Sequence, residues 1–225
     1  MSDVHQGHRA RLRQDFLHNG LESFSDLHAL ELLLFYCIPR SDTNPLAHAL
    51  LDRFKTLSGV LEASPEELCR VDGVGENTAV FLSLVSGVSR RHHIAKADEA
   101  VTQITSAKTA GDYFRPRFLG EKEEVVLAMF ADARRRPLAC EELSRGHVNG
   151  AEIDTRRLAE LALRHRAVFV YLAHNHPSGS PLPSAEDEQT TLRLREVLRP
   201  LNVELTDQII VAGDRAVSLV ECGLL

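Results

Sequence analysis

Residues 167–187 read AVFVYLAHNHPSGSPLPSAED, and this segment sets the architecture of the second half of the chain. It opens with seven apolar residues, which are typical of a strand buried on both faces. The strand ends in His174-Asn175-His176, and the residues after it, rich in Pro, Ser and Gly, predict a loop. A helix follows from Ala185 to Arg199, and Pro200 stops it. The segment therefore predicts a buried strand, a loop and a helix in succession.

Similar alternation extends to both sides of this segment. The apolar run VVLAMFAD after Glu124 predicts a second buried strand, and residues 154–164 predict a helix. Residues 203–221, VELTDQIIVAGDRAVSLVE, predict two or three further strands. Strands that alternate with helices indicate an α/β arrangement for this half of the chain.

The first half predicts helices only. One helix is expected over residues 8–17, and the others begin at capping or proline signals: Ser25, Asn44-Pro45 and Ser64-Pro65-Glu66-Glu67. Asp72-Gly73-Val74-Gly75 predicts a tight turn, and Glu76 begins a helix that runs to about Arg90. The polar residues 95–109 are interpreted as a linker. We therefore expect a two-domain chain, with a helical domain over residues 1–95 and an α+β or α/β domain over residues 103–225.

Composition excludes several classes of protein. The 225 residues are 44% hydrophobic and 26% charged, which suits a folded core rather than a disordered tail. No window approaches 18 consecutive apolar residues, so we expect no transmembrane helix and no membrane partner. The basic N-terminus lacks the apolar run of a secretory signal. Four cysteines without a CxxC pair predict free thiols in a reducing cytoplasm.

The net charge of −6 limits nucleic-acid binding to local contacts. Residues 1–95 carry 9 Lys and Arg against 12 Asp and Glu, and the remainder carries 17 against 20. Neither half is a basic module, so bulk electrostatics would not draw either half to DNA.

The histidine pair predicts a metal site. In an extended backbone, residues i and i+2 point to the same side, so the imidazoles of His174 and His176 converge. Asp187 lies three residues after Ser184 and is expected in the first turn of the next helix, facing back toward the strand end. Three such ligands with one open position are typical of catalytic zinc. The alternative is that Ser184 is a plain helix cap and Asp187 a partner of the helix dipole, and spacing alone does not decide between the two.

Hydrolysis at such a site also needs a general base. Glu121, Glu123 and Glu124 are the candidates in this half, and Glu124 directly precedes a buried strand. On pattern alone, a solvated turn over residues 121–124 is the favoured interpretation.

The segment from His174 to Asp187 has the form HxHPx(6)SxxD, and with an upstream Glu it resembles the JAMM motif of the JAB/MPN metalloproteases. The stretches LAHNHPSG, SPEEL with its DGVG turn, and VSLVECGLL resemble the RadC family of bacterial proteins, over nearly the whole chain. This resemblance implies an MPN domain (JAB-like, cytidine-deaminase-like) over residues 103–225, a mixed β-sheet with flanking helices. It is preceded by an all-α helix-hairpin-helix domain.

The resemblance also implies roles for single residues. His174, His176 and Asp187 match the Zn²⁺ ligands, Glu124 the general acid/base, and Ser184 the serine that helps to hold the oxyanion. Residues 64–90 resemble a helix-hairpin-helix, in which Gly73, Val74 and Gly75 would offer backbone N–H groups to a DNA phosphate weakly and without reading sequence.

Two positions depart from the family pattern. Asp154-Thr155 stands where RadC proteins commonly carry His-Pro, and Asp207-Gln208 stands where they commonly carry Asp-His. Neither position matches a metal ligand, so these differences bear on the support of the ligands or on substrate choice.

Two functions follow as competing hypotheses. The first is a zinc-dependent metallopeptidase or isopeptidase-type hydrolase linked to DNA repair or DNA metabolism. The second is a DNA-associated, non-catalytic module whose MPN domain binds metal or protein partners. A zinc nucleobase deaminase is excluded, because its HxE and PCxxC elements are missing from the sequence. Cys140 as a fourth, structural ligand is disfavoured, since the motif is complete without it.

Overall fold

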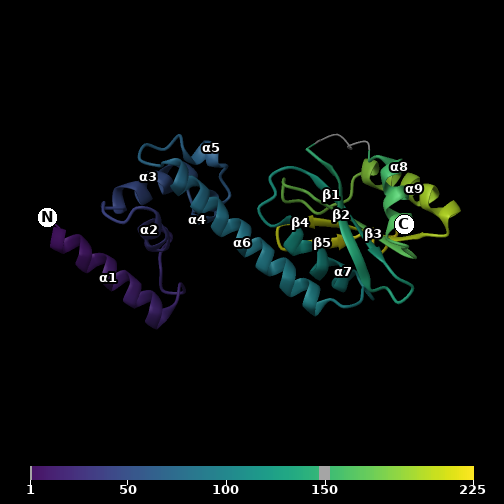
Figure 1. Cartoon of the computed structure of the whole chain (residues 1–225). Helices are drawn as coiled ribbons and strands as arrows, with labels where there is room; N and C mark the ends of the chain where they lie inside the picture. Colours follow the sequence, from purple (N-terminus) through teal and green to yellow (C-terminus); the bar gives the residue numbers. More distant parts are fainter. Residues whose placement is uncertain (1, 147–152) are drawn as a thin grey trace. The chain divides into compact units, whose positions relative to one another are not determined.

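The computed structural model describes residues 2–146 and 153–225 (Figure 1). The chain divides into two compact units, residues 1–89 and 90–225. Within the described residues, no helix has both the length and the apolar character needed to cross a bilayer.

The first unit is helical. Its elements are α1 (Ser2–Asn19), α2 (Asp26–Cys37), α3 (Asn44–Phe54), α4 (Leu57–Leu61), α5 (Pro65–Leu68) and the first half of α6 (Glu76–Ala100). Two predicted helix starts are confirmed by their caps. The Ser25 side chain accepts from the His28 N–H at 3.3 Å, and Ser64 forms a capping box with Glu67. The largest fully buried side chains at the centre of this unit are Leu30, Leu34, Leu50, Leu68 and Leu82.

The prediction of a linker over residues 95–109 is wrong. Helix α6 continues to Ala100, and α7 (Ala107–Phe114) begins seven residues later. The polar residues at the end of α6 are good helix formers on an exposed face, while Ala97 and Val101 are buried. Polarity in this segment therefore marks a solvated helix face. The division of the chain into a domain over residues 1–95 and a domain over residues 103–225 stays a prediction.

The second unit contains a five-stranded mixed sheet. Its strands are β1 (Val125–Ala131), β2 (Pro137–Arg145), β3 (Phe169–Asn175), β4 (Glu204–Ala212) and β5 (Arg215–Ser218), in the order β2-β1-β3-β4-β5. Among the described strands, only β3 and β4 pair in parallel, and the other neighbours are antiparallel. The crossover from β3 to β4 runs through α9 (Ala185–Leu198) and a 3₁₀ turn, η2 (Arg199–Leu201). This mixed sheet with helices confirms the α+β part of the predicted fold class.

Helices cover both faces of this sheet (Figure 1). On one face, α7 and the 3₁₀ turn η1 (Arg115–Phe118) pack on alternate residues of β1, β3 and β4. On the other face, α8 (Thr155–Arg164) and α9 pack on the intervening residues. Gly111 permits a close approach of α7, because a Cβ there would lie 3.0 Å from the Cβ of Ala216.

Strand β2 was not predicted from the sequence. It is an edge strand whose residues are mostly half-buried, and it includes Pro137, Glu141 and Glu142, residues of low strand propensity. Pairing with the buried β1 overrides these local preferences.

Candidate metal centre

Three side chains converge where β3 ends and α9 begins. His174 is the penultimate residue of β3, His176 lies just beyond the strand, and Asp187 is in the first turn of α9. The Nε2 atoms of the two histidines are 2.9 Å apart, and Asp187 Oδ1 lies 3.1 Å from the His174 Nε2. Asp187 Oδ2 lies 3.8 Å from the His176 Nε2. The three predicted ligand residues are therefore brought together, with their ligand atoms within 4.8 Å of one another.

The donor set suits a zinc ion. Two atoms bound to a tetrahedral zinc at about 2.0–2.1 Å lie about 3.3–3.4 Å from each other. The separations of the His174 Nε2 from the His176 Nε2 and from Asp187 Oδ1, 2.9 and 3.1 Å, are a little shorter than this value. Nδ1 of His176 lies 2.7 Å from the Ser180 carbonyl oxygen, which can only accept. His176 must therefore carry its proton on Nδ1, so its Nε2 presents a lone pair toward the other two ligand atoms. A cation between these electron-rich atoms would stabilise the arrangement.

Asp187 is ionised in this setting. Partial burial alone would raise its pKa, but the hydrogen bond and charge interaction with His174 and the hydrogen bonds from Ser184 hold the pKa well below its usual range. The Ser184 N–H and hydroxyl both donate to Asp187 Oδ2, at 2.8 and 2.7 Å, and the Asp187 N–H donates to Ser184 Oγ. Ser184 is thus a helix cap, as one of the two interpretations predicts, and its hydrogen bonds also orient the Asp187 carboxylate.

Glu124 lies beside the strand end that carries the histidines. Val126 pairs with His174 in the antiparallel ladder, and continuing the register by two residues places Glu124 opposite His176. Its side chain is partly buried and makes no hydrogen bond or ion pair with any other residue in the described ranges. Glu124 is not one of the clustered ligand residues.

The other two candidate bases differ from Glu124. Glu121 is held by Arg90 and Arg145, each at 2.5 Å. Burial alone would raise the pKa of Glu121, but these two arginines lower it. Glu123 is exposed. The environments favour Glu124, whose carboxylate is the one that is partly buried and free of arginine partners.

Asn175 fixes the backbone on both sides of Glu124. Its side chain is buried, with 5% exposed, and points away from the face of the histidines. Its Oδ1 accepts from the Val125 N–H at 2.7 Å, and its Nδ2 donates to the Glu123 carbonyl at 2.9 Å. The amide thereby continues the β1–β3 ladder by one step. It positions Glu124, which lies between the two residues that the amide contacts.

Replacing Asn175 by alanine is expected to destabilise the fold by about 1–3 kcal/mol, because the Val125 N–H would remain buried without an acceptor. Urea denaturation of the full chain measures this loss. Asn77→Ala, at an exposed position in the first turn of α6, is the control for a general effect of losing an asparagine. A midpoint for Asn175→Ala equal to that of the wild type would contradict the assigned role.

The predicted nucleic-acid residues lie in the turn between α5 and α6. Gly73 has φ +91°, a left-handed conformation that favours glycine. Val74 is buried, and its N–H donates to the Val71 carbonyl, so neither its side chain nor its N–H is available to a phosphate. The N–H groups of Gly73 and Gly75 have no acceptor among the described residues. Two of the three predicted residues therefore retain a free donor.

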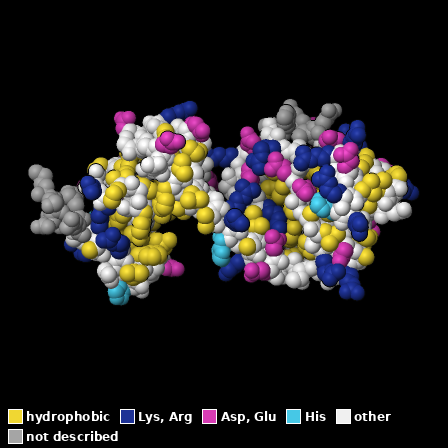
Figure 2. All heavy atoms as spheres, viewed as in Figure 1, with side chains coloured by type: hydrophobic (Ala, Val, Ile, Leu, Met, Phe, Trp, Pro, Cys, Tyr) yellow, Lys and Arg dark blue, Asp and Glu magenta, His cyan; other side chains and the backbone are white. Residues whose placement is uncertain are grey.

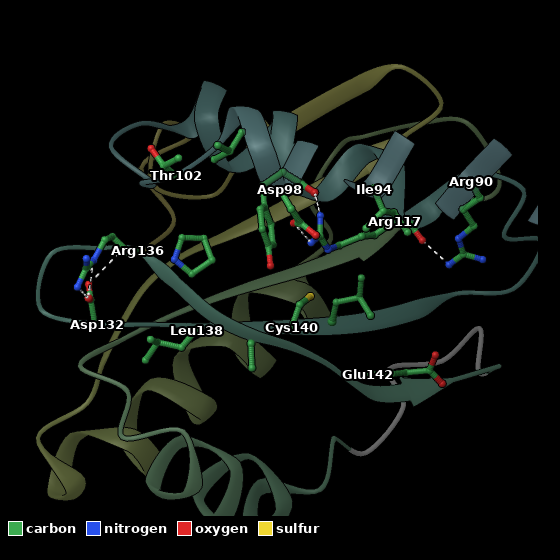
Figure 3. A pocket seen from close by; sticks show the side chains of 15 residues that line it. Arg90, Ile94, Asp98, Thr102, Arg117, Asp132, Arg136, Leu138, Cys140 and Glu142 are labelled. Atoms are coloured by element: carbon green, nitrogen blue, oxygen red, sulfur yellow. Dashed lines mark hydrogen bonds and ion pairs between the residues drawn. The ribbon is translucent and has the colours of Figure 1, made fainter. Parts of the chain in front are cut away.

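A cavity of about 880 Å³ lies on the α7 side of the second unit, apart from the histidine cluster (Figure 3). Arg117 pairs with Asp98 and Arg136 with Asp132 along its wall, so its positive charges are balanced. Cys140 lines this cavity, and burial raises the pKa of its thiol to about 11. Cys140 is therefore no member of the histidine–aspartate cluster, in agreement with the prediction that it is not a fourth ligand.

Sequence reasoning gave no role to three polar residues near these elements. Asp154 caps α8 by accepting from the N–H groups of Arg156 and Arg157. Asn175 lies between the two histidines in the sequence and was given no role there. A polar residue inside a buried strand nevertheless indicates a hydrogen-bonded side chain. Gln208 of β4 contacts His174, and only the parallel pairing of β3 with β4 reveals this contact.

Known proteins resemble this chain over most of its length. The family profile described as RadC-like JAB domain matches residues 104–224. A UPF0758 protein of Fusobacterium nucleatum is 31% identical over 226 residues, which cover 98% of this chain and 97% of that protein. One of Ruegeria pomeroyi is 36% identical over 91% of each chain. A third, of Burkholderia cenocepacia, is 34% identical over 96% of this chain and 83% of the relative. The chain therefore belongs to the RadC family, and residues 104–224 are its RadC-like JAB domain.

Proposed function

We propose that this protein is a zinc-dependent hydrolase of peptide or isopeptide bonds. The convergence of His174, His176 and Asp187 at the end of β3 carries this proposal. These residues would hold the ion through two imidazole nitrogens and one carboxylate, which leaves a position open to water and substrate, as in catalytic zinc sites.

A bound zinc ion would polarise the scissile carbonyl and lower the pKa of a water molecule. Glu124 would accept the proton of the attacking water and deliver it to the leaving amine. A partly buried carboxylate without an arginine partner suits this role. The Ser184 hydroxyl would donate to the oxyanion while its backbone N–H continues to hold Asp187.

The test is cleavage by the zinc-loaded full chain. Its substrates are a library of internally quenched peptides and a matching set in which the quencher is attached through a lysine ε-amino group. We expect turnover that stops with 1,10-phenanthroline and returns with added Zn²⁺. Failure of the loaded protein to cleave either set, or cleavage indifferent to the chelator, would contradict the proposal.

DNA contact through residues 64–90 is the second candidate, in a module that need not be catalytic. The free N–H groups of Gly73 and Gly75, at the start of α6, favour it, because such groups bind phosphate without reading sequence. Charge opposes it, because Asp72 and Glu76 flank the turn and are exposed, and the nearest basic residue along the sequence is Arg70. Figure 2 shows no broad basic surface on the visible face of residues 90–225, where cationic and anionic side chains interleave.

We expect at most a few phosphate contacts, so raising the salt from about 50 to 200 mM should weaken DNA binding about 10–40-fold. Fluorescence anisotropy with a labelled duplex and a branched DNA measures this dependence. Arg70→Glu should weaken binding, while Arg13→Glu on α1 is the matched control. No binding by the wild type at low salt would rule out this candidate.

A further inference from the structure

The cavity on the α7 side of the sheet is a groove between a helix and an edge strand, and all its lining residues belong to the second unit. One side of the groove is lined by every fourth residue along one face of α6: Arg90, Ile94 and Asp98. The other side is lined by every second residue along one face of β2: Leu138, Cys140 and Glu142. The two rows lie on opposite sides of the groove (Figure 3).

The outer edge of β2 borders this groove. In the described sheet β2 has a single neighbour, β1, so the N–H and C=O groups along its other edge have no strand partner. Register shifts interrupt the β1–β2 pairing near both ends, and residues 139–142 of β2 pair regularly between them. Cys140 and Glu142 belong to this regular stretch and line the groove, so the free main-chain groups and the groove lie together.

The charges along the groove are compensated by partners. In addition to the two arginine–aspartate pairs of its wall, Arg90 pairs with Glu121 at 2.5 Å. The arginines therefore leave little net positive charge to attract a phosphate or a nucleic acid. Leu138 is 47% exposed, and further apolar side chains line the groove: Ile94, Val101 and Leu127. This lining suits an uncharged ligand with apolar side chains.

We propose that this groove binds an extended segment of a partner protein, which adds a strand to the free edge of β2. The main chain of the segment would pair with residues 139–142, and every second side chain would enter the groove between Ile94 and Leu138. Because the charges of the groove are compensated, the side chains that enter it would be apolar. The volume of about 880 Å³ lies within the range of about 300–1,000 Å³ that is typical of ligand sites.

A second copy of this chain fits the same edge less well. Two β2 strands related by a two-fold axis at the middle of the strand would place Glu141 opposite its own copy and Glu142 beside it. Like charges at such positions destabilise a strand pair. The register shifts also confine regular pairing to residues 139–142, which suits a short segment better than a whole edge strand.

This groove is separate from the histidine cluster. Leu127, which lines it, belongs to the face of the sheet that α7 covers, whereas His174 follows Leu172 on the face that α9 covers. The proposal therefore goes beyond the proposed hydrolase function and does not depend on a bound metal.

Selection of a phage-displayed library of random peptides on the full chain, with EDTA present, tests the groove without a contribution from metal. We expect enrichment of sequences in which apolar and uncharged polar residues alternate. An enriched peptide is then made in two forms, each methylated at one of the two alternate sets of main-chain nitrogens. Only one form should lose binding, because only one set of N–H groups faces β2. Enrichment of no sequence, or equal binding by both forms, would overturn the proposal.

Leu138→Glu should weaken binding of the labelled peptide at least about tenfold, because it places a charge where an apolar side chain of the peptide would lie. Leu163→Glu makes the same change at another exposed leucine, on α8, and is the matched control. Thermal unfolding verifies that both variants are folded. Equal binding by the two variants would contradict the assigned site.

Hydrogen exchange measured by mass spectrometry locates the bound peptide. The peptide should slow exchange in β2 and leave β5, the strand at the other edge of the sheet, unchanged. Slower exchange in β5 with none in β2 would place the peptide at the other edge and overturn the proposal.

Discussion

Glu124→Gln is expected to abolish hydrolysis without removing the metal. The glutamine amide has nearly the same shape as the carboxylate, but it does not accept a proton from water or return one to a leaving amine. Loss of a general acid/base typically lowers the rate about 10²–10⁴-fold. Because Glu124 is not one of the clustered ligand residues, zinc content should remain at the wild-type value. Peptide cleavage and atomic emission on the same preparation measure both quantities.

Glu123→Gln is the matched control for this variant. It makes the same chemical change one residue earlier. The side chain of Glu123 is exposed, and Glu123 contacts Asn175 through its backbone carbonyl only. Wild-type turnover is expected for it. Turnover retained in Glu124→Gln, or lost equally in both variants, would contradict the role assigned to Glu124.

Asp187→Asn is expected to weaken zinc binding about 100-fold or more, because it replaces an anionic ligand by a neutral amide. Asparagine keeps an oxygen that can accept from the Ser184 N–H, so the helix cap should survive and the effect on stability should be small. Atomic emission after dialysis against a weak chelator measures the retained metal, and thermal unfolding measures the fold.

Glu186→Gln removes one carboxylate from the same first turn of α9, at an exposed position, and is the control for the helix dipole. It should retain the metal. If Asp187→Asn held zinc as tightly as this control, Asp187 would be a capping residue and no ligand.

Local signals predicted the helices with clear caps and the strands that are apolar throughout. Ser25 and Ser64 mark helix starts by chemistry that acts within three residues, and β1 and β3 are too apolar to be exposed. The length of α6 and the existence of β2 were missed. Both depend on partners distant in sequence: Val101 packs in the core of the second unit, and β2 pairs with β1.

The candidate site divides in the same way. Strand periodicity places His174 and His176 on the same side of β3, and the helix cap at Ser184 places Asp187 in the first turn of α9. The spacing of these residues therefore predicted that their side chains lie close together. The sequence already favoured Glu124 among the three glutamates by its place before a buried strand and by the resemblance. Only the structure shows the arginines around Glu121 and the amide of Asn175 that set Glu124 apart from its neighbours. The contact between Gln208 and His174 depends on which strand lies beside β3, information that no local pattern contains.

X-ray absorption at the zinc edge of the loaded full chain tests the metal site most directly. A single equivalent of Zn²⁺ should show two imidazoles and one or two further oxygen ligands, with no sulfur, and the imidazole signal should fall in His174→Ala. A zinc ion surrounded by sulfur, or by water oxygens without imidazole, would contradict the assignment of His174, His176 and Asp187 as its ligands.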